Sequence, residues 1–150
     1  ASCFLLPACR QRAKEEGIEE RVRFVTDCPR DATAVNAVFD VSVLSSHYEG
    51  LPYVILESLA LEIPVVASDI PGCRDLVVPG ETGMLYPPRN AEQLCAVLSH
   101  LLERPEDGRR LADRGRALVE EQYAAPAWIR RIETLYRSVL AATPTTTGRP

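Results

Sequence analysis

The sequence predicts an α/β fold in which a Rossmann-like parallel sheet carries helices on both faces and the chain ends in helices. Three observations predict it. Strand-like and helix-like segments alternate, the strand-like segments are short and rich in β-branched residues, and amphipathic segments follow the last of them. Such alternation indicates parallel strands joined by crossover helices. Ligands of these sheets bind outside the carboxyl ends of the strands, so residues that directly follow a strand are the first candidates for a site.

The first part of the chain supplies short elements. We expect Gly17 to end a helix, because glycine readily adopts the left-handed conformation that follows a last helical turn. The expected elements are a strand at 2–6, a helix at 8–16, a strand at 22–25, a short helix at 31–38, a strand at 41–44 and a helix at 52–61.

The second part adds two strands and then becomes helical. Asn90 is expected to cap the helix that follows it. The expected elements are a strand at 64–67, a helical turn at 73–77, a strand at 83–86 and helices at 91–103, 106–121 and 126–141. In the last helix we expect an inward apolar face made of Trp128, Ile129, Ile132, Leu135, Tyr136 and Val139.

Size and composition indicate an ordinary globular domain. The chain has 150 residues, 46% of them apolar, and a net charge of −4, which gives no reason to expect nucleic acid as a partner. We expect one partial domain over 1–142 and a disordered tail over 143–150. No apolar run approaches the roughly 20 residues of a membrane span, and no signal-peptide pattern opens the chain. The sequence therefore predicts a cytoplasmic protein, and its five widely spaced cysteines favour free thiols.

The most informative segment runs from the strand at 41–44 into the next helix. Gly50 lets the backbone turn sharply, and Pro52 suits the first turn of a helix, where its missing N–H is not needed. A helix start presents unpaired N–H groups and a partial positive charge, which together suit a phosphate. Two glutamates, Glu49 and Glu57, bracket this turn. Glu57 has apolar neighbours in the helix, and a buried carboxylate needs a partner.

This segment resembles a known family. Ser46-x-x-Glu49-Gly50-Leu51-Pro52-x-x-x-x-Glu57 is similar to the E-x7-E signature of the retaining glycosyltransferases of family 4 (glycosyltransferase group 1). Two later blocks, residues 60–72 and 80–85, resemble the family's next blocks in the same order. The resemblance covers roughly residues 15 to 140, and several ordered blocks are far more specific than one motif.

The resemblance implies the GT-B fold, with this chain as most of the C-terminal, donor-binding domain. It implies that Glu49 contacts the donor sugar and assists the reaction, and that Glu57 accepts hydrogen bonds from the ribose of a UDP- or GDP-sugar. It also implies that backbone amides of the turn bind the diphosphate, whereas Pro52 cannot donate. The amides available for this are those of Gly50, Leu51, Tyr53 and Val54. Ser46 and His47 are expected to lie at the sugar pocket, and neither a metal nor a cofactor is implied.

Several features depart from the family's pattern. Glu62, Cys73 and Asp75 stand where the family usually has Gly, Gly and Glu. The family's basic Arg–Lys pair and its acceptor domain belong to a segment before this chain. The chain is therefore expected to be an inactive fragment of a glycosyltransferase. The acceptor and any membrane association would depend on the missing half.

Plainer interpretations stay open at this stage. Glu49, taken alone, is more simply a turn residue, and a structural role for His47 is the alternative to a place at the sugar pocket. Arg74 could reach a phosphate, although a surface role is favoured. The alternative for the whole chain is a non-catalytic nucleotide-binding or scaffold domain that kept the fold.

Overall fold

The computed structural model describes residues 5–26 and 32–142. By their internal contacts these residues form two compact units, one up to Val35 and one from Asn36 onward. The second unit holds the sheet and all the predicted site residues. The expected tail at 143–150 and the first residue of the helix expected at 31–38 lie outside the described residues.

The first unit contains α1 (Leu6–Glu15) and a short 3₁₀ helix, η1 (Glu19–Arg21). Gly17 has φ +65°, which confirms that it ends the first helix. The strand predicted over 2–6 is wrong at Leu6, which opens α1, and its residues 2–4 lie outside the described part. The strand predicted at 22–25 is also wrong. Val22 has an extended backbone, but no described strand pairs with this segment, and a strand is defined by its partner.

The second unit is built on a parallel sheet of three strands in the order β1–β2–β3. The strands are β1 (Ser42–Leu44), β2 (Val65–Ser68) and β3 (Met84–Tyr86), as predicted to within a residue or two. Val43 pairs with Val66, and Ala67 pairs with Leu85. All three carboxyl ends therefore meet at one edge, formed by Leu44, Ser68 and Tyr86.

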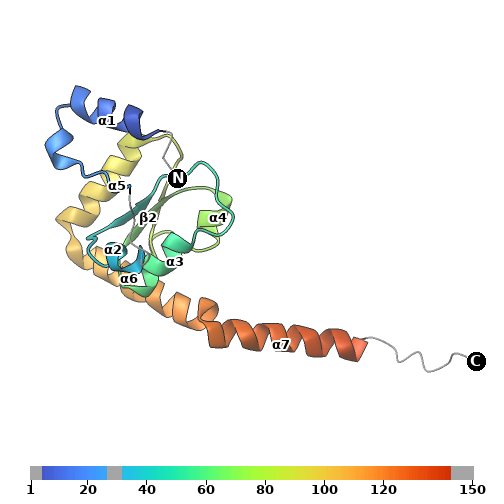
Figure 1. The fold of residues 1–150 in the computed structure, drawn as a ribbon. Helices are drawn as coiled ribbons and strands as arrows, with labels where there is room; N and C mark the ends of the chain where they lie inside the picture. The colour runs from blue at the N-terminus through green and yellow to red at the C-terminus, as the bar shows by residue number, and fades with distance from the viewer. Residues whose placement is uncertain (1–4, 27–31, 143–150) are drawn as a thin grey trace, which may run out of the picture. The chain divides into compact units, whose positions relative to one another are not determined.

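Helices cover both faces of this sheet (Figure 1), which confirms the predicted fold class. Val65 and Ala67 of β2 pack with α3 (Tyr53–Ala60) and α4 (Pro71–Arg74) on one face. Val66, between them, packs on the opposite face with α5 (Ala91–Glu103) and α6 (Pro105–Leu118). Successive side chains of β2 thus belong to two apolar clusters, one on each face of the sheet, as expected of a strand buried on both faces.

Helix boundaries agree with the predictions except where the chain turns tightly. α5 begins and ends as predicted, and the Asn90 side chain caps it by accepting from the amide of Gln93 at 3.0 Å. α2 (Ala32–Asn36) is shorter than the predicted 31–38. α4 begins at Pro71 rather than at Cys73, because a proline fits the first turn of a helix.

Glycines let α6 approach the rest of the unit closely. A Cβ on Gly115 would lie 2.5 Å from Cδ2 of the fully buried Leu59 in α3. A Cβ on Gly108 would lie 3.2 Å from the ring of Pro64, just before β2. The first of these contacts leaves no room for a side chain, so Gly115 sets the distance between α6 and α3.

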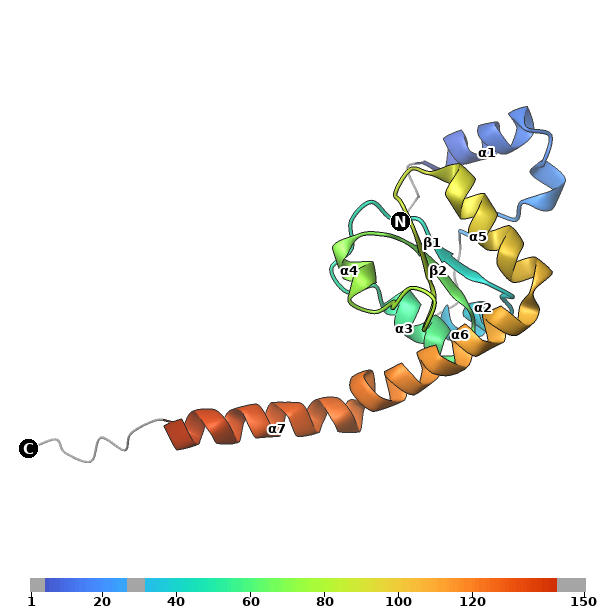
Figure 2. The same cartoon turned by 180° about the vertical axis from the view of Figure 1, so that it is seen from behind.

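The last helix differs most from expectation. After α6 a π-helical turn, η2 (Val119–Tyr123), leads into α7 (Ala125–Ala142), which extends away from the sheet (Figure 2). The predicted inward face of α7 is wrong, because Trp128 and Tyr136 are 57% and 66% exposed and so anchor no core. Of the predicted face, Ile132 is half-buried, and the exposed members are Trp128, Ile129, Leu135, Tyr136 and Val139.

Glu62 occupies a position where glycine is the usual residue. It has φ +58°, and it directly follows Leu61, which ends α3. The Glu62 amide donates to the carbonyl of Leu59, and the Ile63 amide donates to that of Ser58, which is the Schellman pattern. The Glu62 carboxylate also pairs with Arg116 at 2.8 Å. The helix end is therefore formed in spite of the missing glycine, and at the edge of the sheet opposite the predicted site.

The left-handed backbone of Glu62 predicts that glycine is more stable than alanine at this position, the reverse of their order inside a helix. Glu62→Gly should be more stable than Glu62→Ala by about 1 kcal/mol, because both remove the carboxylate and only alanine keeps the left-handed strain. Arg114, exposed within α6, is the control, where Gly should be less stable than Ala by about the same amount. Urea unfolding of the four variants measures both differences. If Glu62→Ala is more stable than Glu62→Gly, as expected inside a helix, the assignment of backbone strain to Glu62 is contradicted.

Candidate functional site

The turn after β1 is organised around Glu49. This side chain is half-buried, and its Oε1 accepts a hydrogen bond from the Ser46 hydroxyl at 2.7 Å. The neighbouring His47 is exposed and makes no hydrogen bond or ion pair with any described residue. The structure thus brings Ser46 and Glu49 together and leaves the role of His47 a prediction.

The start of α3 offers a row of free amides. Pro52 is buried and takes the N-cap position, with the helix running from Tyr53. Within the described residues, no oxygen accepts from the amides of four residues, namely Gly50, Leu51, Tyr53 and Val54. The first three are exposed and Val54 is half-buried. Unpaired N–H groups at a helix N-terminus form an electropositive site that suits an anion.

Glu57 has the partner that its apolar surroundings require. Its Oε2 accepts from the side-chain amide of Asn36 at 3.3 Å, and Asn36 is 7% exposed. The carboxylate itself is half-buried, and Oε1 has no protein partner among the described residues. Asn36 therefore holds one oxygen of Glu57 and leaves the other able to accept from a ligand. No local pattern in the sequence pointed to Asn36, which lies 21 positions earlier.

The start of α4 presses against the Glu49 turn. A Cβ on Gly72 would collide with the backbone oxygen of Glu49 and would lie 2.7 Å from that of Gly50. Both neighbours are backbone atoms, so no side-chain rotation can make room. The loops that follow β1 and β2 therefore meet at the carboxyl edge of the sheet, and Gly72 is what permits their contact.

Two buried side chains lie beneath this contact. Ser68, at the end of β2 and 1% exposed, donates from its hydroxyl to the carbonyl of Ser46 at 2.6 Å. Cys73 is fully buried in the core cluster, and burial raises the pKa of its thiol. The negative charge of Glu49 raises that pKa further. Cys73 thus fills the core beneath the turn as a protonated thiol.

Arg74 is already paired. Its Nε donates to the Asp69 carboxylate at 2.5 Å, and this hydrogen bond holds the pKa of Asp69 below its usual value. The pair is exposed, so its contribution to stability is small. The expected surface role of Arg74 agrees with this contact. Asp75 is exposed, and its carbonyl accepts from the Tyr123 hydroxyl at 3.1 Å, which ties η2 to the end of α4.

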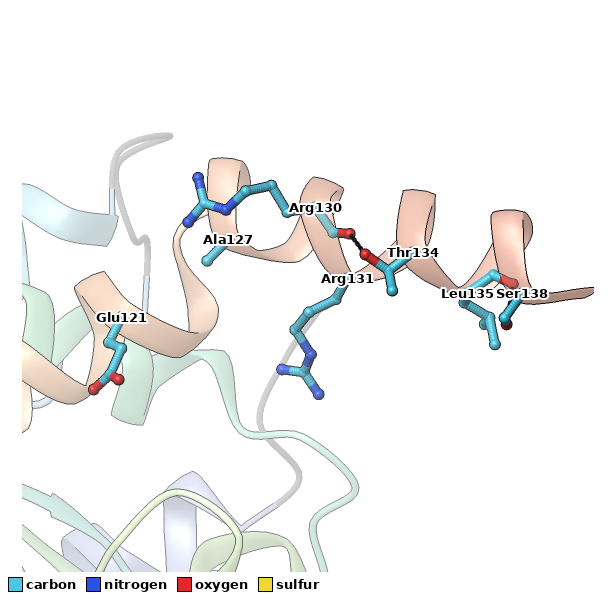
Figure 3. A pocket seen from close by; sticks show the side chains of 7 residues that line it. All are labelled: Glu121, Ala127, Arg130, Arg131, Thr134, Leu135 and Ser138. Atoms are coloured by element: carbon cyan, nitrogen blue, oxygen red, sulfur yellow. Dashed lines mark hydrogen bonds between the residues drawn. The ribbon is translucent and has the colours of Figure 1, made fainter.

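A separate hollow of about 590 Å³ lies along η2 and α7 (Figure 3). Arg130 and Arg131 point away from each other there, and the Thr134 hydroxyl donates a hydrogen bond to the carbonyl of Arg130 at 2.8 Å. The polar groups therefore do not converge on one ligand. The hollow is lined by Glu121, Ala127, Arg130, Arg131, Thr134, Leu135 and Ser138.

Two kinds of site are missing from the described residues. Within residues 5–26 and 32–142, no three His, Cys, Asp or Glu side chains gather so as to hold a metal ion. No helix in this part of the chain combines the length and apolar character needed to cross a membrane. Cys9, Cys73 and Cys95 are free thiols.

A helix start with free amides and two flanking carboxylates thus lies at the carboxyl edge of a parallel sheet, which is where open α/β domains bind their ligands. Residues 8–118 match the model of the family "Glycosyl transferases group 1". The match covers most of the chain, and the chain belongs to this family.

Curated relatives are sugar transferases of several kinds. The D-inositol 3-phosphate glycosyltransferase of Thermomonospora curvata is 39% identical over 101 residues, which are 67% of this chain and 23% of that protein. The alpha-D-kanosaminyltransferase of Streptomyces kanamyceticus is 32% identical over 100 residues, 67% of this chain and 26% of that protein. The chain thus spans about a quarter of the length of these relatives.

Solved structures agree on the fold. Sucrose-phosphate synthase from Thermosynechococcus elongatus superposes with a TM-score of 0.80 at 31% identity, over 91% of this chain and 35% of that one. The Anabaena protein HepE, solved in complex with UDP, gives a TM-score of 0.83 at 23% identity, over 89% of this chain and 36% of that one. These neighbours are glycosyltransferases of the GT-B fold, so the predicted family and fold are confirmed.

Proposed function

We propose that this chain is the donor-binding part of a retaining glycosyltransferase, which transfers a sugar from a nucleoside diphosphate to an acceptor. The observation that carries the proposal is the free amide row at the start of α3, flanked by Glu49 and Glu57. The family supplies the class of reaction, sugar transfer. Its donor, stereochemistry and residue roles are our inferences.

The diphosphate of the donor is proposed to bind at the start of α3. Its oxygens are negative and need several donors at once, which the amides of Leu51, Tyr53 and Val54 offer without a side chain. As the sugar departs, negative charge grows on the diphosphate. Fixed N–H groups stabilise that charge without having to reorganise.

In this proposal the two glutamates contact different parts of the donor. Glu57 keeps one oxygen free while Asn36 holds the other, so it can accept from a hydroxyl of the donor's ribose. Glu49, oriented by Ser46, is proposed to face the sugar ring, where positive charge develops as the bond to the diphosphate breaks. Ser46 and His47 would border the same pocket.

The nucleotide is proposed to be UDP or GDP. HepE has been solved with UDP and with UDP-glucose, which supports a UDP-sugar, although its identity to this chain is 23%. The names of the relatives include kanosaminyl and mannosyl transfer, so the family does not fix one sugar. We expect the donor to act as a substrate without a metal or other cofactor.

The alternative is a scaffold domain that binds nucleotide without transferring sugar. The departures from the family's pattern at Glu62 and Cys73 are one argument for this alternative, and the structure weakens that argument. Glu62 completes a helix end at the far edge of the sheet, and the Cys73 side chain faces the core. No residues of this sequence were matched to the family's basic pair, and this is the reason that remains.

Product stereochemistry tests the proposal. The full-length protein is given UDP-glucose or GDP-mannose with water as the acceptor, and the released sugar is followed by proton NMR before mutarotation. Retention predicts that an α-linked donor first yields the α-anomer. Release of the β-anomer would contradict a retaining reaction. The absence of any nucleoside diphosphate release with either donor would favour the scaffold alternative.

The 150 residues alone are expected to give no turnover. The relatives devote most of their length to parts outside this match, and positioning both substrates supplies much of the rate of such reactions. The test compares nucleoside diphosphate release by the purified chain and by the full-length protein at equal concentration. Comparable rates would show that the chain carries the whole active site.

A further inference from the structure

We propose that Ser68 is a positioning residue for Glu49 and that it acts through Ser46. This inference rests on the proposed function, in which Glu49 faces the donor sugar. Ser68 lies at the end of β2, whereas Ser46 and Glu49 lie in the turn after β1. Two hydrogen bonds connect the three residues.

The first hydrogen bond joins the end of β2 to the turn that follows β1. The Ser68 hydroxyl donates to the Ser46 carbonyl at 2.6 Å, and the 1% exposure of Ser68 shields this bond from water. β2 is the central strand, with a partner on each side, so Ser68 is held by the most constrained element of the sheet. The bond therefore fixes the backbone of Ser46 relative to β2.

The second bond reaches the carboxylate. The Ser46 hydroxyl donates to Oε1 of Glu49 at 2.7 Å, which selects one orientation of a half-buried side chain. A hydroxyl can orient a carboxylate in this way only while its own backbone is fixed. Without Ser68, the turn keeps its contact with Gly72 but loses the polar bond that fixes Ser46.

Cys73 is fully buried in the core cluster beneath the same turn. Burial and the charge of Glu49 raise the pKa of its thiol. The Ser68 hydroxyl has one proton, which the Ser46 carbonyl takes, so the sulfur cannot receive that proton at the same time. The bond to Ser46 is thus the one that Ser68 donates.

The test is a double-mutant cycle in the full-length protein. Nucleoside diphosphate release is measured with whichever of UDP-glucose and GDP-mannose the wild-type protein hydrolyses. Ser68→Ala should lower kcat about tenfold, because the Ser46 hydroxyl would no longer hold the Glu49 carboxylate in one orientation, and leave KM for the donor unchanged. In a Glu49→Ala background the same substitution should have almost no effect, because the group that it positions is gone.

Two further variants separate positioning from general packing. Ser68→Thr keeps the hydroxyl and should recover most of kcat. Thr82→Val removes another buried hydroxyl, which accepts from the Val78 amide at 2.9 Å, and should leave kcat unchanged. Thermal unfolding of each variant shows how much stability is lost.

Each outcome of the cycle decides between the two claims. If Glu49→Ala lowers kcat and Ser68→Ala does not, the positioning role is overturned and the proposed function stands. If Ser68→Ala lowers kcat equally in both backgrounds, its role is structural and the inference is wrong. If Glu49→Ala itself leaves kcat unchanged, the proposed role of Glu49 fails, and the inference fails with it.

Discussion

Gly72→Ala should lower kcat of the full-length protein by about 100-fold, the order of loss that a displacement of about 1 Å causes at a reacting centre. The added methyl group would overlap the backbone oxygen of Glu49 and lie 2.7 Å from that of Gly50. Either α4 or the Glu49 turn must move, and both border the proposed sugar site. Stability should fall as well, by about 1–3 kcal/mol, as in other overpacked positions.

Gly115→Ala is the matched control for this prediction. It too places a methyl group against a buried neighbour, 2.5 Å from Cδ2 of Leu59, but it does so between α6 and α3. It should therefore cost stability without a comparable loss of kcat. Donor turnover and urea unfolding of both variants check this. A Gly72→Ala protein that keeps normal kcat would show that the contact between the two loops does not position the site.

Glu57→Ala should weaken nucleotide binding, while Glu49→Ala should mainly lower turnover. In the proposed site Glu57 meets the ribose, which does not react, so it binds the ground state and the transition state equally and its loss raises KM. Glu49 meets the sugar, where charge changes during the reaction, so its loss lowers kcat. Each substitution removes a hydrogen bond to a charged group, which is worth about 1.5–3 kcal/mol.

Two further variants, at Asn36 and Glu81, are compared with Glu57→Ala in their affinity for nucleotide. Asn36→Ala frees the Glu57 carboxylate from its protein partner, and it should weaken binding less than Glu57→Ala does. Glu81, exposed in the loop before β3, is the control, and Glu81→Ala should leave the affinity unchanged. Titration calorimetry with UDP and with GDP measures all three. Unchanged affinity in a folded Glu57→Ala protein would remove Glu57 from the site.

Local patterns predicted the elements that depend on local chemistry. The extent of α5 followed from a continuous apolar stripe together with Asn90, whose cap bond spans three residues. The strands of the sheet followed from short β-branched runs. The turn between Glu49 and Tyr53 followed from Gly50 and Pro52, whose backbone preferences act where they stand.

What the sequence missed depends on contacts between distant residues. Asn36 and Ser68 are hydrogen-bonded to Glu57 and Ser46 across 21 and 22 positions, and no spacing rule links such pairs. Gly72 matters because of the backbone atoms that it faces, which its own neighbours in the sequence do not reveal. For α7, the periodicity identified the apolar face correctly but could not show whether anything covers it.

The central claim is that the start of α3 binds the diphosphate of a sugar nucleotide between Glu49 and Glu57. A crystal structure of the full-length protein with bound UDP tests it most directly, with GDP as the second ligand if UDP does not bind. We predict diphosphate oxygens within hydrogen-bond distance of the amides of Leu51, Tyr53 or Val54, and a ribose hydroxyl on Glu57. A nucleotide bound elsewhere, with these amides and Glu57 left free, would contradict the claim.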